Sequence, residues 1–151
     1  MKKLLTVVAI VALSVGIGKA QNPIPAGTVF INAAAGFSNH GFPVIAGVDF
    51  GVGSDISAGA EAAYRFNYDG RWSIGANANY HFNRLLKMSS KFDFYAGINV
   101  GSTFGDHYDT SFNLGAQVGG RIFITDAIGL NLQLGGGNNF SGGRFGLTFR
   151  L

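Results

Sequence analysis

The stretch Trp72-Ser73-Ile74-Gly75-Ala76-Asn77-Ala78-Asn79-Tyr80-His81-Phe82-Asn83 decides the fold. Apolar and aromatic residues occupy every even position, and Ser, Gly, Asn or His occupies every odd position. Side chains of a β-strand point alternately to its two faces, whereas a helix would mix the two sets around its circumference. The pattern therefore predicts a strand with one apolar face and one polar face.

The same alternation recurs in other segments of about ten residues, which is the length that a tilted strand needs to cross a bilayer. These segments are residues 29–37, 44–52, 56–66, 92–100, 112–124, 128–134 and 145–151. Together with residues 72–83 they make an even number of strands. We therefore predict an all-β fold, an eight-stranded antiparallel up-and-down transmembrane β-barrel over residues 21–151.

Residues 1–20 are typical of a cleaved signal peptide. Lys2 and Lys3 precede an uncharged apolar run over residues 4–17, and Gly18-Lys19-Ala20 places small residues where a signal peptidase cuts. The apolar run is too short to cross a bilayer as a helix, which needs about 20 residues. An uncleaved anchor is the alternative. The chain contains no cysteine, which excludes a lipoprotein.

Removing residues 1–20 also removes three of the 11 basic residues, which leaves eight basic against eight acidic ones. The high isoelectric point thus comes from the export signal and gives no support for a nucleic-acid-binding surface. Charged residues make up only 13% of the chain, against about 25% in an average soluble domain. We infer that some of the surface does not face water.

Aromatic residues on the apolar face sort by height if successive strands run outward and inward. One girdle is predicted at the extracellular end, with Phe37, Tyr64, Phe66, Trp72, Phe104 and Phe112. The other is predicted at the periplasmic end, with Phe50, Tyr80, Phe82, Phe92, Phe94 and Phe149. Such girdles suit a lipid-facing surface, whereas a secreted soluble β-domain, the alternative, has no reason to sort residues by height.

The connections orient the barrel in the same way. Gly53-Ser54-Asp55 and Thr125-Asp126-Ala127 are short, as periplasmic turns are. Residues 38–42, 68–71, 105–110 and 135–143 then form the extracellular loops, with Asp69-Gly70 as a hairpin turn. The connection from Arg84 to Ser90 is long for a periplasmic turn, and a helical turn at the membrane interface is one account of it.

The chain resembles the small outer-membrane β-barrels of the OmpX and OmpA transmembrane-domain type over the whole of residues 21–151. The resemblance rests on the architecture and on the last strand, Arg144-Phe145-Gly146-Leu147-Thr148-Phe149-Arg150-Leu151. It implies that the barrel-assembly machinery recognises this strand during insertion. It also implies outer-membrane lipids and lipopolysaccharide as surroundings.

Charged residues on the polar face would lie in the lumen, where they are tolerated chiefly when paired or hydrated. They are Asp49, Glu61, Arg65, Asp93, Arg121, Arg144 and Arg150. We predict that they form a polar network that plugs a narrow lumen, because an eight-stranded barrel is about filled by its own side chains. A gated path for small ions is the alternative.

Other residues give weaker signals. Asp106-His107-Tyr108-Asp109 has metal-ligand chemistry without a defined fourth ligand, so no metal site is predicted. His40 is predicted to be a loop residue and His81 a hydrogen-bonding residue of the lumen. Gly135-Gly136-Gly137 lacks the following helix of a phosphate-binding loop and is predicted to end a strand.

The expected function is a structural or surface-interaction role in the outer membrane. A passive channel for small solutes or ions is the main alternative. An enzyme acting on lipid A or peptides is not predicted, because the outward positions lack a Ser, His and acidic residue. No catalytic residue, cofactor or nucleic-acid partner is expected.

Overall fold

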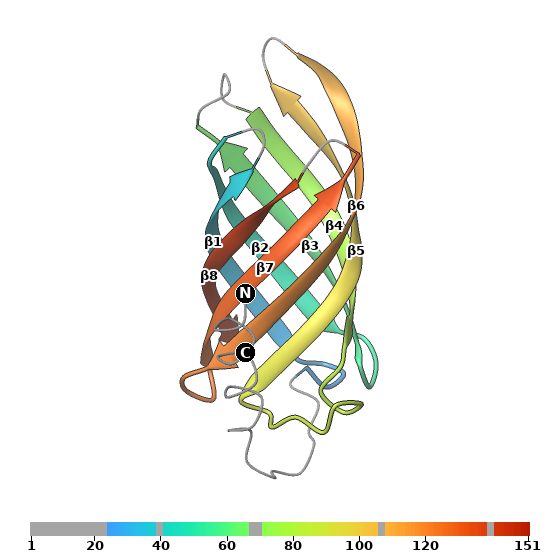
Figure 1. The fold of residues 1–151 in the computed structure, drawn as a ribbon, viewed down its shortest axis with the longest axis vertical. Helices are drawn as coiled ribbons and strands as arrows, with labels where there is room; N and C mark the ends of the chain where they lie inside the picture. The colour runs from blue at the N-terminus through green and yellow to red at the C-terminus, as the bar shows by residue number, and fades with distance from the viewer. Residues whose placement is uncertain (1–23, 39–40, 67–70, 106–107, 139–140) are drawn as a thin grey trace, which may run out of the picture.

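The structure is a computed structural model that describes residues 24–38, 41–66, 71–105, 108–138 and 141–151. Its strands are β1 (Val29–Ser38), β2 (Pro43–Gly51), β3 (Ile56–Arg65), β4 (Arg71–His81), β5 (Phe92–Gly105), β6 (Tyr108–Phe123), β7 (Ile128–Gly137) and β8 (Ser141–Arg150). Each strand pairs antiparallel with the next, and β8 pairs with β1 to close a barrel (Figure 1). The predicted eight-stranded up-and-down barrel is therefore confirmed.

Closure runs along nearly the whole length of the first and last strands. The β1–β8 register extends from Phe30 opposite Arg150 to Ser38 opposite Gly142. Complete closure leaves no sheet edge with unpaired backbone groups, which is what a strand-built protein needs in lipid. Among the residues described, no helix is long and apolar enough to cross a membrane. The predicted signal peptide lies outside the described residues.

The barrel has two ends, which we call the turn end and the loop end. The turn end, at the bottom of Figure 1, carries the connections β2–β3, β4–β5 and β6–β7. There Val52 donates to the carbonyl of Ile56, and Ile124 donates to that of Ile128, so the two predicted tight turns close as expected. The loop end carries β1–β2, β3–β4, β5–β6 and β7–β8. Asp69-Gly70 and His40 lie outside the described residues.

Two connections at the loop end are shorter than predicted. β5 continues to Gly105 and β6 begins at Tyr108, while β7 continues through Gly137 and β8 begins at Ser141. The glycine-rich residues at 135–137 and 142–143 stay in the ladder, with Gly135 opposite Gly142. Glycine there gave no alternation to read, so the sequence ended β7 too early and began β8 too late.

The β4–β5 connection is a compact turn and contains no assigned helix. The amide of Leu86 donates to the carbonyl of Phe82 at 2.8 Å, and that of Met88 donates to Asn83 at 2.8 Å. Lys87 ends the turn with a φ of 52°, the left-handed region that non-glycine residues rarely adopt. Leu85 and Leu86 remain exposed at the turn end.

The two faces follow the predicted alternation. Exposed apolar side chains cover the outside, for example Ile74, Ile98, Leu114 and Leu132. Buried side chains inside are mostly polar or charged, which is the reverse of the arrangement in a soluble barrel. The outer surface is therefore apolar although the interior is not.

Candidate functional site

Arg121 is the centre of the interior side-chain network. Its Nη1 donates to Asp93 Oδ2 at 2.9 Å, and its Nη2 donates to Asp49 Oδ2 at 2.5 Å. The side chains of all three residues are at most 6% exposed. The guanidinium also lies over the rings of Phe30 and Tyr95, with 4.9 Å and 4.6 Å to the ring centroids. One cation thus holds two carboxylates from opposite sides of the barrel.

His81 continues this network from Asp93 toward β3. Its Nδ1 lies 2.7 Å from Asp93 Oδ1, and its Nε2 lies 2.9 Å from Ser57 Oγ. Ser57 and His81 have no exposed surface. The histidine is therefore a hydrogen-bonding residue of the interior, between a carboxylate and a hydroxyl.

Asp49 continues the network in the other direction. Its Oδ2 accepts a hydrogen bond from Asn32 Nδ2 at 2.9 Å, and Asn32 Oδ1 accepts one from Thr148 Oγ1 at 2.7 Å. The chain of contacts from Ser57 to Thr148 then includes a residue from every strand except β7. Such a network links strands that are not neighbours in the sheet.

A layer of amide side chains lies above Arg121, toward the loop end, and the Tyr95 hydroxyl contacts its two members on β7. The Tyr95 hydroxyl lies 2.9 Å from Gln133 Oε1 and 3.1 Å from Asn131 Oδ1. Gln133 Nε2 donates to Gln117 Oε1 at 3.0 Å, and Gln117 Nε2 donates to Asn79 Oδ1 at 2.6 Å. We call the four amide residues, Asn79, Gln117, Asn131 and Gln133, the amide layer. It crosses the lumen without a formal charge.

An apolar cluster closes the turn end below Arg121. Ile24, Phe30 and Phe123 are buried together, and the two rings lie 5.7 Å apart. The Arg150 guanidinium lies over Phe123 at 4.1 Å and over Phe30 at 5.5 Å. We call these four residues the turn-end plug. Ile24 precedes β1, so a short segment before the first strand contributes to it.

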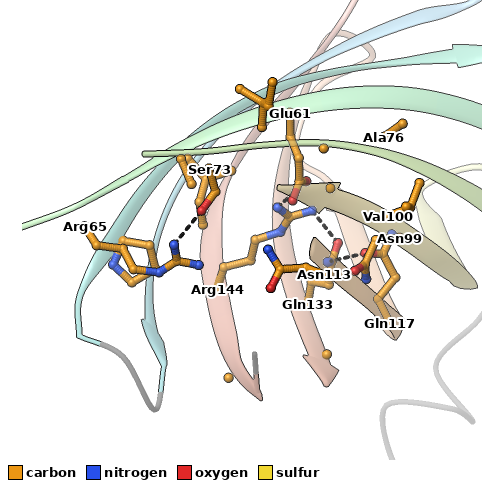
Figure 2. A pocket seen from close by; sticks show the side chains of 18 of the residues that line it. Glu61, Arg65, Ser73, Ala76, Asn99, Val100, Asn113, Gln117, Gln133 and Arg144 are labelled. Carbon is orange, nitrogen blue, oxygen red and sulfur yellow. Dashed lines mark hydrogen bonds and ion pairs between the residues drawn. The ribbon is translucent and has the colours of Figure 1, made fainter. Parts of the chain in front are cut away.

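The loop-end half of the lumen contains a cavity of about 90 Å³, which we call the cup. Its charged lining residues are Glu61, Arg65 and Arg144 (Figure 2). Arg144 Nη1 donates to Glu61 Oε2 at 2.6 Å, and Arg65 Nη1 donates to Ser73 Oγ at 2.5 Å. The side chains of Arg144 and Glu61 are 15% and 28% exposed, so water reaches this level.

A much smaller gap separates the cup from Asp49. It measures about 10 Å³ and is lined in part by Asn32, Asp49, Glu61 and Arg144. A space of this size holds about one water molecule. Water therefore has access to the loop-end half of the lumen, whereas the side chains of Asp49, Asp93 and Arg121 are almost fully buried.

The structure places six of the seven charged residues predicted for the lumen in three groups. Asp49, Asp93 and Arg121 form one, Glu61 and Arg144 form the second, and Arg150 belongs to the turn-end plug. Arg65 donates a hydrogen bond to Ser73 at the loop end. Sequence reasoning missed Tyr95, Phe30 and Phe123, because aromatic residues at interior positions look like breaks in a polar face.

The residues predicted as girdles lie on the outer face at both ends. Near the loop end, the Tyr64 ring lies 5.0 Å from Trp72 and 5.0 Å from Phe66. Near the turn end, the Phe82 ring lies 5.0 Å from Tyr80 and 5.6 Å from Phe94. Phe37, Phe66, Trp72, Phe104, Phe112, Phe50, Tyr80 and Phe94 are exposed, whereas Phe82, Phe92 and Phe149 are half-buried. Ring contacts on the outer face thus join Tyr64 to Phe66 and Trp72 near the loop end, and Phe82 to Tyr80 and Phe94 near the turn end.

Ser57, His81 and Asp93 have the order of groups found in serine hydrolases: hydroxyl, imidazole and carboxylate. Here the hydroxyl has no exposed surface, and Arg121 already holds the carboxylate. A substrate has no access to Ser57 in this conformation. Among the described residues, no group of three His, Asp or Glu could hold a metal ion. Asp106-His107 lies outside the described residues.

Neither a protein-family model nor a curated protein sequence matches this chain. Solved structures do match. The N-terminal β-barrel domain of Pseudomonas aeruginosa OprF aligns with a TM-score of 0.68 at 12% identity, covering 83% of this chain and 98% of that one. Neisserial surface protein A aligns with a TM-score of 0.58 at 19% identity, covering 82% and 95%.

A structure from the de novo design of transmembrane β-barrels also aligns, with a TM-score of 0.66 at 13% identity, covering 83% and 97%. The fold is therefore that of small eight-stranded outer-membrane barrels. The apolar outer surface agrees, because lipid is the solvent in which such a surface is stable. Fold and surface together are those of an outer-membrane protein. Identities this low carry the fold and leave the function to be argued from the interior.

Proposed function

We propose that this protein is a structural or surface-interaction barrel of the outer membrane, of the OmpX and OmpA transmembrane-domain type, with a closed lumen. The observation that carries the proposal is the interior at the level of Arg121, where one guanidinium joins Asp49 to Asp93 and contacts two rings. The amide layer above it and the turn-end plug below it add two further barriers. A resting barrel filled in this way has no continuous water path.

The proposal includes the surroundings of the barrel. Residues 1–20 are removed on export, the loop end is extracellular, and β8 is recognised by the barrel-assembly machinery. Rings such as Tyr64 and Trp72 would then lie at the boundary with lipopolysaccharide, and Phe82 and Phe94 at the inner boundary. Terminal sequencing of the exported protein tests the cleavage site, with Gln21 as the expected first residue.

Conductance in a planar bilayer tests the closed lumen. We expect the purified protein to give no discrete conductance steps across a range of pH and salt, while a porin reconstituted in the same way does. Steps of uniform size would contradict the closed lumen and support the channel alternative. Heat-dependent migration on a denaturing gel checks that the protein tested is a folded barrel.

An enzymatic role is the alternative to a structural one that the arrangement of Ser57, His81 and Asp93 suggests. Because Ser57 is fully buried, we propose that these groups are structural. A serine-directed fluorophosphonate probe should leave the folded protein unlabelled, and lipid A should be unchanged by deletion or overexpression. Labelling that is lost in Ser57→Ala would contradict this assignment.

A further inference from the structure

The β4–β5 connection has a lysine where its backbone favours glycine. This connection, yellow-green at the bottom of Figure 1, spans residues 82–91. The amide of Met88 donates to the carbonyl of Asn83 at 2.8 Å, and that of Lys87 donates to Arg84 at 3.3 Å. These two bonds form a Schellman motif, whose fifth residue has a positive φ and is usually glycine. Here it is Lys87, with a φ of 52°, which points to a use of the lysine side chain itself.

Asn83 holds the connection in one shape from inside the barrel. Its side chain is fully buried, and its Oδ1 accepts a hydrogen bond from the amide of Phe94 at 3.1 Å. Its Nδ2 donates to the carbonyls of Phe92 and Ser89. The connection is thus attached to the start of β5, and its exposed residues are held in place without a ligand.

Two leucines extend the apolar outer face beyond the strand ends. Leu85 and Leu86 are 67% and 54% exposed. The amide of Leu86 donates to the carbonyl of Phe82, so these two residues are one helical turn apart and share a side of the turn. Phe82 contacts Tyr80 and Phe94 in the turn-end girdle. Leu86 therefore adjoins the ring level at which hydrocarbon gives way to headgroups.

Positive charge gathers at this connection of the turn end. Arg84, Lys87 and Lys91 belong to it. The β2–β3 and β6–β7 connections contain no basic residue, and each contains one aspartate, Asp55 or Asp126. Arg84 pairs with Asp55, whereas neither lysine has an ion pair among the residues that the structure describes. Both lysines are exposed. We call residues 84–91 the basic turn.

We propose that the basic turn binds anionic phospholipid headgroups in the membrane leaflet at the turn end. Lys87 and Lys91 supply the charge at the headgroup level, and Leu85 and Leu86 enter the boundary of the acyl chains. Attraction to an anionic leaflet falls off within a Debye length, so the lysines must be held close to the surface. The Schellman motif and Asn83 provide this placement.

This interaction goes beyond the proposed structural role. Under the proposed orientation, the leaflet concerned is the periplasmic one. Lipid binding needs a barrel that spans a bilayer but does not need a closed lumen. Conductance steps would therefore contradict the closed lumen and leave the lipid site intact, and loss of the lipid site would leave the closed lumen intact.

Nuclear magnetic resonance of the folded protein in nanodiscs tests the proposal. The discs contain phosphatidylcholine with an increasing fraction of phosphatidylglycerol, at low salt. We expect saturable shifts of the backbone amides of Leu86, Lys87 and Met88, and smaller shifts at Gly53 and Thr125 in the two turns without lysine. Lys87→Gln combined with Lys91→Gln should weaken the response about tenfold or more, because each lysine near an anionic surface adds to the attraction.

Lys87→Gly separates the role of the side chain from that of the backbone. Glycine adopts the positive φ without strain, so the turn should keep its shape while the ammonium group is lost. We expect about fivefold weaker binding of phosphatidylglycerol, with an unchanged or higher denaturant midpoint in phosphatidylcholine. Lys87→Arg is the matched control, because it keeps the charge at the same position and should keep the binding.

Three results would overturn the proposal. These are equal shifts in all three turns of the turn end, unchanged binding by Lys87→Gly, or equal losses in Lys87→Arg and Lys87→Gly. Inorganic phosphate added to phosphatidylcholine nanodiscs is the last arm, and it should leave the basic turn unshifted. If free phosphate shifts the same amides to saturation, the basic turn binds a free anion and the lipid proposal is wrong.

Discussion

Arg121 and Asp49 are joined across the barrel by a hydrogen bond of 2.5 Å, although they are 72 positions apart in the chain. Their strands, β6 and β2, are not neighbours in the sheet. Ladder hydrogen bonds hold only adjacent strands, so this contact is a brace across the lumen. Asp93 on β5 is the second support of the same guanidinium.

Removing the Arg121 guanidinium should lower the free energy of unfolding. Arg121→Met keeps a long side chain but leaves Asp49 and Asp93 buried without their cation, which typically costs about 3–5 kcal/mol. Urea unfolding in lipid vesicles should show the loss as a lower midpoint. Lys91→Met removes the same charge from an exposed position and should change the midpoint little.

If unpaired carboxylates cause the loss of stability in Arg121→Met, a triple variant that also neutralises them should regain part of that stability. Arg121→Met combined with Asp49→Asn and Asp93→Asn removes the unpaired charges, so it should be more stable than Arg121→Met alone. A triple variant no more stable than the single one would show that the lost packing over Phe30 and Tyr95, not charge, sets the stability.

Gly119→Ala should destabilise the barrel by about 1–3 kcal/mol, the usual cost of overpacking. An added Cβ at Gly119 would overlap the ring and hydroxyl of Tyr95, which stands opposite it in the β5–β6 register. The denaturant midpoint measures the effect. At Gly53 the nearest atom would be Ile56 Cβ at 3.9 Å, so Gly53→Ala is the control. Equal effects of the two substitutions would argue against a packed Tyr95.

Phe30→Ala and Phe37→Ala compare the two faces of one strand. Phe30 is fully buried in the turn-end plug, so its truncation should cost about 3–5 kcal/mol, as in a protein core. Phe37 is 67% exposed on the outer face, and its truncation should cost less. Unfolding free energies in the same vesicles make the comparison. A larger loss from Phe37→Ala would contradict the interior plug.

An arginine on the outer face should report depth in the membrane. Ala60 is exposed near the middle of β3, so Ala60→Arg should destabilise the folded barrel by about 2–4 kcal/mol in lipid. Ile124, just beyond the turn end of β6, lies near a boundary, and Ile124→Arg should cost about 0–1 kcal/mol. Equal costs for the two variants would mean that the girdles do not mark the edges of the lipid belt.

The strands could be predicted from the sequence because alternation is a local property. Residues 72–83 show their two faces without any knowledge of their neighbours, and the structure forms β4 over Arg71–His81. Glycine hid the ends of β7 and β8, because a residue without a side chain belongs to neither face. The long β4–β5 connection also carried no periodic signal.

The interior contacts could not be predicted, because they depend on the register of every strand. Sequence reasoning placed Arg121 and Asp49 in the lumen, but not against each other. A signal for three of the large interior side chains exists once the register is known, because each of these three stands opposite a glycine. Tyr95 faces Gly119, Phe123 faces Gly129, and Arg144 faces Gly36.

The hydrogen bond between Asn32 and Thr148 joins residues 116 positions apart, on the first and last strands. Contacts of such high sequence separation form late, since the intervening chain must already be ordered. A barrel that has not yet closed therefore leaves Asn32, and through it Asp49, without a full set of partners. Closure of the barrel and completion of this buried hydrogen bond therefore occur together, so an incompletely closed barrel would leave the side-chain oxygen of Asn32 without its donor.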